Sequence, residues 1–393
     1  MNKKFILSTA VALLMGGLMG ATLRADDVIK IPKGADFLGG TPPTPIAITG
    51  FSGEVAAALK FDLTVMGFTN VPADKANFIL SGSNNGNVQG QLSSGKTVLF
   101  SKAYSGANIR AQAHRLSDDV VMKLTGVNGI AETRVAFKVD TGAHSEIYIA
   151  DFDGHNPQAV TSDNTIVAAP CWVPGRLALY YTTYKLNTPN IFYQNLATGE
   201  RRNFAHYAGL NTAAAVSPDG SKVAMVLSKD GSPDIYITDA SGNNLKRLTK
   251  TREDESSPCW SPDGRWICFA SKINERRALY KVSVDGGEPQ RIPTSGVSNP
   301  SEPDYSPDGK WIIFTAQMGG FEICVVPAAG GAATVLVAGE DPSWAPNSRT
   351  VIFAQRKGGN RVLSLLDVPT KQVKDVSRVS GSNSSNSQPS WAR

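Results

Sequence analysis

The C-terminal two-thirds of the chain repeats one pattern of short apolar segments separated by polar turns. Five segments fit one template, in which an aromatic or small residue precedes Ser-Pro-Asp-Gly or a close variant of it. The turn prolines are Pro174, Pro218, Pro262, Pro307 and Pro346. They are spaced by 44, 44, 45 and 39 residues, which is the period of a four-stranded propeller blade. The repeat therefore predicts a β-propeller.

Each repeat has the pattern of four strands, as the third one illustrates. Its turn, Ser261–Gly264, combines a Pro that presets φ, an Asp that bonds to its own backbone and a Gly that accepts positive φ. The segment after the turn is almost wholly apolar, which is typical of a strand buried on both faces. The four predicted strands cover residues 258–260, 266–270, 278–284 and 290–293.

The two ends of the repeat region complete one blade between them. The second strand of a blade recurs six times, around Phe137, Tyr180, Met225, Phe269, Phe314 and Phe353. Residues 133–139 form such a strand with no inner strand before it, and residues 388–393 form an inner strand with no turn after it. Pairing of the last strand with Arg134–Val139 would close the ring and remove its open edges. We predict a six-bladed propeller over residues 133–393.

Residues 26–132 have a different pattern and predict a small α/β domain. Residues 53–66 and 109–124 place apolar side chains at helical spacing, and Gly126 marks the end of the second helix. Residues 45–49 form a predicted strand, and three further strands at 78–80, 87–92 and 96–102 suggest an antiparallel run. The fold class is thus α/β plus all-β, with a hinge at 125–132.

The first 25 residues have the features of a secretory signal peptide. Lys3 and Lys4 precede an uncharged apolar stretch, and Ala25 offers a small residue for cleavage. The alternative is an uncleaved membrane anchor, although the apolar run is short for a bilayer. We expect a cleaved signal at 1–25 and a mature protein in the periplasm, without membrane insertion.

Charge and reactive residues exclude several classes of function. Removing the three basic residues of the signal lowers the net charge from +5 to 5 − 3 = +2, which is too little for a nucleic-acid-binding protein. The four histidines lie far apart without metal-ligand spacing, so we expect no metal or cofactor. Export permits disulfides, but Cys171, Cys259, Cys268 and Cys324 occupy strand positions that favour buried thiols.

Several segments outside the turns resemble the TolB family of the Tol-Pal cell-envelope system. They are residues 114–136 around the second helix and hinge, 150–156 in the first hairpin, and 246–249 and 286–292 at blade ends. The resemblance covers nearly the whole mature chain. It implies a non-catalytic, monomeric protein that binds a Pal-like peptidoglycan-associated lipoprotein at the propeller channel and a TolA-like inner-membrane protein through its N-terminus. It also implies roles in envelope integrity and in outer-membrane constriction during cell division.

The resemblance directs attention to two candidate binding segments. The channel rim is formed by the loops that join one blade to the next, and these carry Asn211, Glu253, Asp254, Glu255, Asn299 and Glu302. This set is interpreted either as a partner site or as a solvated rim. The second segment is the arm Asp26, Asp27, Val28, Ile29, Lys30 and Ile31, whose alternation suits strand addition to a partner or a first strand of the domain.

A propeller by itself does not define a function, because the same fold serves proteins of several functional classes. A propeller-type serine hydrolase needs a Gly-x-Ser-x-Gly elbow, which the sequence lacks. A metal-dependent lactonase needs carboxylates that converge in the channel, whereas the inner strands are mostly Ala, Pro, Ser and Cys. A carbohydrate-binding propeller would show aromatic residues on the rim, where few are visible.

Overall fold

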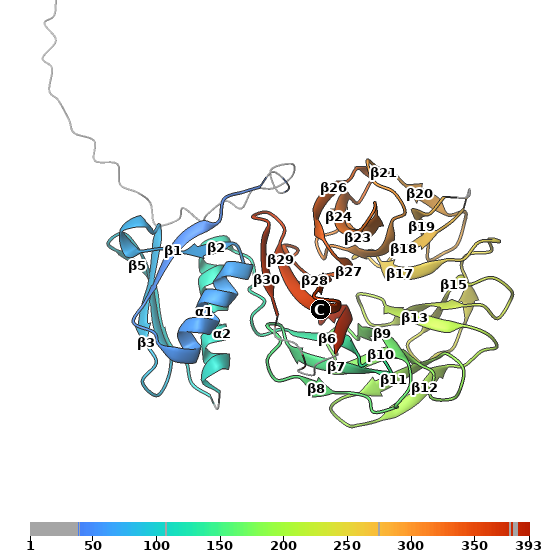
Figure 1. The fold of residues 1–393 in the computed structure, drawn as a ribbon, viewed down its shortest axis with the longest axis horizontal. Coiled ribbons are helices and arrows are strands. Elements are labelled where there is room, and N and C mark those ends of the chain that lie inside the picture. Colours follow the sequence, from blue (N-terminus) through green and yellow to red (C-terminus); the bar gives the residue numbers. More distant parts are fainter. Residues whose placement is uncertain (1–37, 39, 107, 274–275, 377–378, 380–383) are drawn as a thin grey trace, which may run out of the picture.

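The computed structural model has a small α/β domain beside a six-bladed propeller (Figure 1). It describes residues 38, 40–106, 108–273, 276–376, 379 and 384–393. The predicted signal peptide and the N-terminal arm lie outside these residues. In the part that is described, neither helix combines the length and the apolar character needed to cross a bilayer.

Two helices cover one face of the N-terminal sheet, and each begins and ends as the sequence predicts. Helix α1 (Gly53–Val65) carries Glu54 in its first turn, where a carboxylate interacts favourably with the helix dipole. Helix α2 (Ile109–Thr125) is capped by Asn108, whose side chain accepts hydrogen bonds from two backbone N–H groups of the first turn. It ends at Gly126, which adopts the left-handed conformation at φ 71°.

The N-terminal sheet has five strands in the order β2-β1-β3-β4-β5. Strand β1 pairs in parallel with β2 and β3, and β3, β4 and β5 form the antiparallel run that the pattern predicts. Strand β2 and the short helix η2 (Ala73–Lys75) were missed, because each has only three residues. The strands are β1 (Thr44–Thr49), β2 (Phe68–Asn70), β3 (Phe78–Ser83), β4 (Gln89–Ser94) and β5 (Thr97–Ala103).

Six four-stranded sheets make up the propeller, as predicted. We name them blades A to F in ring order, and each begins with its inner strand. Blade B contains β9 (Val167–Trp172), β10 (Ala178–Thr183), β11 (Asn190–Asn195) and β12 (Arg201–Ala205). Blade C contains β13 (Asn211–Val216), β14 (Lys222–Leu227), β15 (Asp234–Asp239) and β16 (Lys246–Arg247). Blade D contains β17 (Ser256–Trp260), β18 (Trp266–Ser271), β19 (Ala278–Ser283) and β20 (Gln290–Ile292).

The remaining blades include the one that closes the ring. Blade E contains β22 (Ser301–Tyr305), β23 (Trp311–Gln317), β24 (Phe321–Pro327) and β26 (Thr334–Ala338), and blade F contains β27 (Glu340–Trp344), β28 (Thr350–Lys357), β29 (Asn360–Asp367) and β30 (Gln372–Asp375). A short parallel pair, β21 (Thr294–Ser295) and β25 (Gly331–Ala332), joins the outer edges of D and E. Blade A contains β31 (Ser385–Trp391), β6 (Arg134–Asp140), β7 (Ser145–Asp151) and β8 (Gln158–Ala159).

The closure in blade A confirms the central prediction from the sequence. Strand β31 is antiparallel to β6, with Trp391 opposite Val135 and Ser385 opposite Asp140. The C-terminal strand and the first propeller strand therefore form one sheet, although they are about 250 residues apart in the chain. Figure 1 shows the red C-terminal end inside the ring, beside the green strands of blade A.

A tryptophan precedes the turn in three of the five repeats, and each of these three packs between two blades, as expected. Trp260 lies in the apolar cluster shared by blades C and D, and its indole N–H donates to the carbonyl of Ala215 at 2.8 Å. The Ser-Pro-Asp-Gly turns adopt the predicted geometry, with Gly264 at φ 68° and its N–H bonded to the carbonyl of Ser261. In the structure all four cysteines are free thiols, and three of them are buried.

The two domains share one apolar core. Buried residues of the helices, such as Leu59 and Leu63, form one cluster with Ile352 and Leu365 of blade F and with Trp391 of blade A. Figure 1 shows the helices on the side of the sheet that faces the propeller. Gly67 lies so close to blade F that an added Cβ would overlap the guanidinium of Arg349. The helices therefore dock directly onto the propeller.

Candidate functional site

A cavity of about 850 Å³ lies on the axis of the propeller and is lined by the inner strands. All six inner strands border it, because each blade places its first strand against the axis. Consecutive blades contact each other through these strands, and β31 contacts β9 to complete the circle. The cavity is thus the central channel, and its wall is formed by equivalent residues of six repeats.

The channel wall contains a ring of six residues that share an unusual backbone conformation. Each sits at a β-bulge of its inner strand and has φ between 50° and 56°. A bulge leaves one residue unpaired and re-aims its side chain, and all six residues line the cavity. The ring consists of Ala169, Ala213, Ser257, Glu302, Asp341 and Gln388.

The ring has one small-residue half and one polar half. On the polar half, each side chain accepts a hydrogen bond from the backbone N–H of the next ring member. Glu302 accepts from Asp341 at 3.1 Å, Asp341 accepts from Gln388 at 3.0 Å, and Gln388 accepts from Ala169 at 2.9 Å. The polar side chains therefore link blades E, F, A and B. The other half of the wall carries the short side chains of Ala169, Ala213 and Ser257, which extend less far into the channel.

The polar half of the channel carries more carboxylates than the sequence suggested. Asp304, two residues after Glu302 in β22, also lines the cavity, and it is paired with the guanidinium of Arg393. Burial raises the pKa of Asp304, although Arg393 opposes this. Burial and the neighbouring Glu302 raise the pKa of Asp341 to about 7. The expectation that the inner strands carry few carboxylates was wrong for blades E and F.

Two of the six predicted rim residues are buried inside their loops. The amide of Asn211 is fully buried and bonds to backbone groups of Tyr207, Pro189 and Gly209. The carboxylate of Glu255 is also buried and accepts from the hydroxyls of Thr249 and Thr251. Burial raises its pKa to about 7. These contacts favour a supporting role in the loops over direct contact with a partner.

The other four predicted rim residues lie where a partner can reach them. Glu253, Asp254 and Asn299 are exposed, and Glu302 is half-buried in the channel ring. Asp254 and Glu302 both line the cavity, from blades D and E. These two adjacent blades therefore give the channel mouth a side with several acidic groups, although Arg277 of blade D lines the same cavity.

Sequence reasoning missed the apolar side chains at the same mouth. The hairpin between β10 and β11 exposes Leu186 and Tyr184, beside Ile166 of the preceding loop. The backbone N–H of Tyr184 donates to the carbonyl of Ile166 at 3.0 Å, which holds the two loops together. Blade E exposes Met318 and Phe321 in its equivalent hairpin. Blades B and E are three steps apart in a ring of six, so Tyr184 and Phe321 do not form a common aromatic platform.

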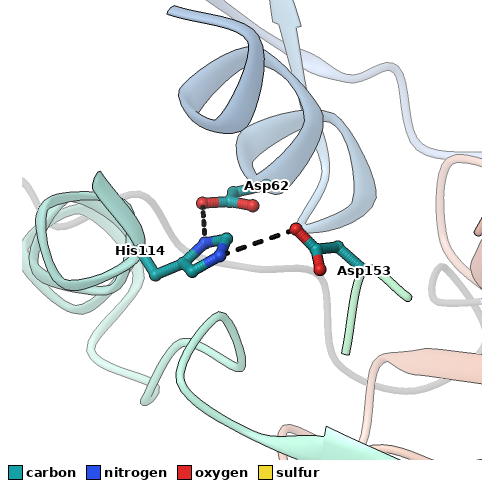
Figure 2. Close-up of side chains that lie close together, drawn as sticks. All are labelled: Asp62, His114 and Asp153. Atoms are coloured by element: carbon teal, nitrogen blue, oxygen red, sulfur yellow. Dashed lines mark hydrogen bonds and ion pairs between the residues drawn. The ribbon is translucent and has the colours of Figure 1, made fainter. Parts of the chain in front are cut away.

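A second cluster of titratable groups lies at the junction of the two domains (Figure 2). Asp62 comes from α1, His114 from α2, and Asp153 from the turn between β7 and β8 of blade A. His114 Nδ1 lies 2.8 Å from Asp62 Oδ2, and its Nε2 lies 3.5 Å from Asp153 Oδ2. All three side chains are buried. The two motifs that carry residues 114 and 153 in the sequence therefore meet in the structure.

The junction cluster presents ligand atoms within 4.8 Å of one another, which is close enough to test for a metal site. However, the guanidinium of Arg110 already binds Asp153 Oδ2. Nδ1 of His114 is hydrogen-bonded to Asp62, and Nε2 lies at ion-pair distance from Asp153 without a hydrogen bond. When His114 is protonated, the two carboxylates, the guanidinium and the imidazolium sum to zero charge without a metal ion. The cluster is better described as an ionic junction.

Fold and site together define a β-propeller protein with an N-terminal α/β domain and an open, partly acidic channel mouth. Residues 121–393 match the family model of the TolB β-propeller domain. TolB proteins of the Tol-Pal system from Bordetella pertussis and Bordetella bronchiseptica are each 34% identical to this chain over 275 residues, or 68% of its length. The chain belongs to the TolB family. Its matched part spans 63% and 62% of those two relatives.

Solved structures show the same architecture. TolB from Acinetobacter baumannii superimposes with a TM-score of 0.80 at 24% identity, and the match covers 90% of this chain and 97% of that one. A putative TolB from Agrobacterium tumefaciens gives a TM-score of 0.53 at 18% identity, covering 67% of this chain and 99% of that one. At these identities the two likenesses concern the fold.

Proposed function

We propose that this protein is a non-catalytic binding component of a Tol-Pal system that works in the periplasm after its signal peptide is removed. Its channel mouth binds a Pal-like lipoprotein, and its N-terminal arm, residues 26–31, binds a TolA-like inner-membrane protein. Through these contacts it supports envelope integrity and constriction of the outer membrane during division. Membership of the TolB family and the open channel mouth are the observations that support this proposal.

The chemistry of the mouth supports protein binding. Its acidic side comprises Glu253, Asp254 and Glu302, and its apolar side comprises Ile166, Tyr184 and Leu186. A surface with apolar anchors and charges near them is typical of a protein interface, because the anchors supply affinity and the charges supply orientation. We propose that the partner presents basic groups to blades D and E and an apolar group to blade B.

Reversing the two exposed acids of the rim is expected to weaken the binding of the Pal soluble domain. We predict that Glu253→Lys with Asp254→Lys raises the dissociation constant about tenfold at low salt, and that the difference shrinks as salt is added. Calorimetry with the Pal soluble domain from the same organism measures both. Glu255 is unsuitable for this test because its carboxylate holds the loop together.

The matched control reverses two exposed charges at the other end of the same blade. Strand β19 begins at the channel mouth and ends at Ser283, so the following hairpin carries Asp285 and Glu288 away from it. Asp285→Lys with Glu288→Lys makes the same change in net charge and is expected to leave affinity unchanged. Equal loss in both double variants would contradict the assignment of the acidic rim, and no binding by the wild-type protein would contradict the partner.

The apolar side of the mouth gives a separate prediction. Leu186→Ser is expected to weaken binding of the Pal soluble domain by about 5- to 30-fold, because an apolar anchor of an interface contributes about 1–2 kcal/mol. Leu186 is 55% exposed, so its loss is expected to leave the unfolding temperature almost unchanged. Val335→Ser, which changes another exposed apolar residue on the outer strand of blade E, serves as the control. Unaltered affinity of Leu186→Ser would remove blade B from the interface.

A further inference from the structure

The ionic junction between the domains has a composition that makes it sensitive to protons. Its charged groups come from three elements: Asp62 from α1, Arg110 and His114 from α2, and Asp153 from blade A. Figure 2 shows the imidazole of His114 lying between the two carboxylates. With His114 as an imidazolium the four charges sum to zero. With a neutral imidazole, two buried carboxylates face one guanidinium.

We propose that Asp62, His114 and Asp153 form a proton-dependent latch that strengthens docking of the N-terminal domain on the propeller while His114 is charged and weakens it when His114 loses its proton. The latch joins parts of the chain on opposite sides of the hinge at 125–132, so its loosening affects docking of the domains more than the fold of either one.

The surroundings of His114 support an imidazolium in the docked state. Burial opposes its charge, but the hydrogen bond and the negative charge of Asp62 raise the pKa of His114 overall. Burial also raises the pKa of Asp62, against the bonds from His114 and Ser117. Both shifts mean that the pair keeps a proton to a higher pH when docked than when apart. Packing of the imidazole against the Phe152 ring of blade A, at 5.6 Å between centroids, keeps water away from it.

The other charged groups near the latch keep Asp153 ionised or lie at the edge of the cluster, so none of them removes the negative charge that faces His114. Arg110 lowers the pKa of Asp153 against the effect of burial, so Asp153 stays ionised at neutral pH. His155 lies 3.2 Å from Asp153 on its solvent side, and Glu54 lies 3.4 Å from Arg110. Asp118, on the next turn of α2, accepts hydrogen bonds from the backbone of Ala131 and Glu132 in the hinge. Burial raises the pKa of Asp118 to about 7.

The direction of the pH effect follows from these shifts. A group whose pKa is raised by docking contributes its full stabilisation below its ordinary pKa, about 6.5 for histidine, and loses it as pH rises through the raised value. Docking is therefore expected to be firm near pH 6 and to weaken toward pH 9. Because Asp153 has a lowered pKa, its own contribution is lost only in strong acid, well below this window.

Hydrogen exchange of the full chain tests the latch directly. After correction for the intrinsic pH dependence of amide exchange, peptides covering α2 and residues 148–156 are expected to open about tenfold more often at pH 9 than at pH 6. In His114→Gln the same peptides are expected to show no pH-dependent change. His206→Gln replaces an exposed histidine of blade B and is expected to behave like the wild-type protein.

A second measurement keeps the proposal falsifiable if His114→Gln does not fold. The imidazole of His114 in the wild-type protein can be titrated by NMR, with its signal assigned by elimination from single variants of the other three histidines. A titration midpoint above 6.5 supports the latch. A midpoint at or below 6.5, or an interface whose protection is the same at pH 6 and pH 9, would overturn it.

Discussion

Replacing Trp391 with alanine is expected to lower the free energy of unfolding by about 3–5 kcal/mol. Trp391 is 2% exposed and belongs to the core that joins the N-terminal domain to blades A and F of the propeller. Its indole N–H donates to the hydroxyl of Thr133 at 2.8 Å, and its backbone N–H donates to Ser343 of blade F. The residue thus bonds to blade A through its side chain and to blade F through its backbone, and only the side-chain contacts are lost in the variant.

Trp266→Ala is the matched control because it removes the same type of side chain from blade D. The four strands of blade D are consecutive in the chain, so this blade does not depend on the C-terminal strand. Trp266 is only half-buried at the start of β18, with the ammonium of Lys281 over its ring. Its loss is expected to cost about 1–2 kcal/mol. Urea unfolding, followed by circular dichroism, compares the two variants. If both variants lose the same free energy of unfolding, closure of blade A does not contribute more to stability than the packing of an ordinary blade.

The ring closure was predictable because it depends on short-range patterns. Each blade repeats the same turn, and the turn is specified by residues such as Ser261–Gly264 that adopt its geometry without help from distant contacts. The incomplete repeats at 133–139 and 388–393 then left one pairing that avoids an open edge. The end of α2 at Gly126 was equally local, since C-capping involves only neighbouring backbone groups.

The channel ring was not predicted, because a bulge changes which side chain faces the axis. Simple alternation along an inner strand does not reveal the residue that adopts positive φ. A signal was present nevertheless: in five of the six ring positions the next residue is a proline, as at Glu302-Pro303 and Gln388-Pro389. Proline removes a backbone donor and is found at bulges in sheets, so this repeated dipeptide marks the unpaired position.

The junction cluster could not be predicted from the sequence for a different reason. Asp62, His114 and Asp153 are brought together only by docking of the two domains, which no local pattern encodes. The available hint was a charged residue within an apolar helical stripe, since Asp62 lies three positions after Leu59 and both are buried. Such a residue implies a buried partner but does not identify it.

Arg110→Ala is expected to destabilise the protein by about 3–5 kcal/mol at neutral pH, because it leaves the buried carboxylate of Asp153 without its main counter-charge. The side chain of Asp153 is 1% exposed, and that of Arg110 is 9% exposed. Arg115→Ala removes the same charge from the same helix, but Arg115 is 37% exposed and lies 3.8 Å from Glu132. We expect it to cost less than about 1 kcal/mol.

Two measurements show whether Arg110→Ala loses stability because Asp153 is left without a counter-charge or because packing is lost. They are the pH dependence of the loss and the effect of adding Asp153→Asn. Arg110 lowers the pKa of Asp153, so the stabilisation is present above the ordinary aspartate value of about 3.8 and is lost as pH falls through the lowered value. The difference between Arg110→Ala and wild type is therefore expected to stay constant down to about pH 4 and to shrink only as pH falls below about 3.8. Adding Asp153→Asn should recover part of the loss at pH 7, since a neutral amide needs no counter-ion. If the double variant is no more stable than Arg110→Ala alone, and the loss is independent of pH, then packing by the arginine side chain explains its contribution.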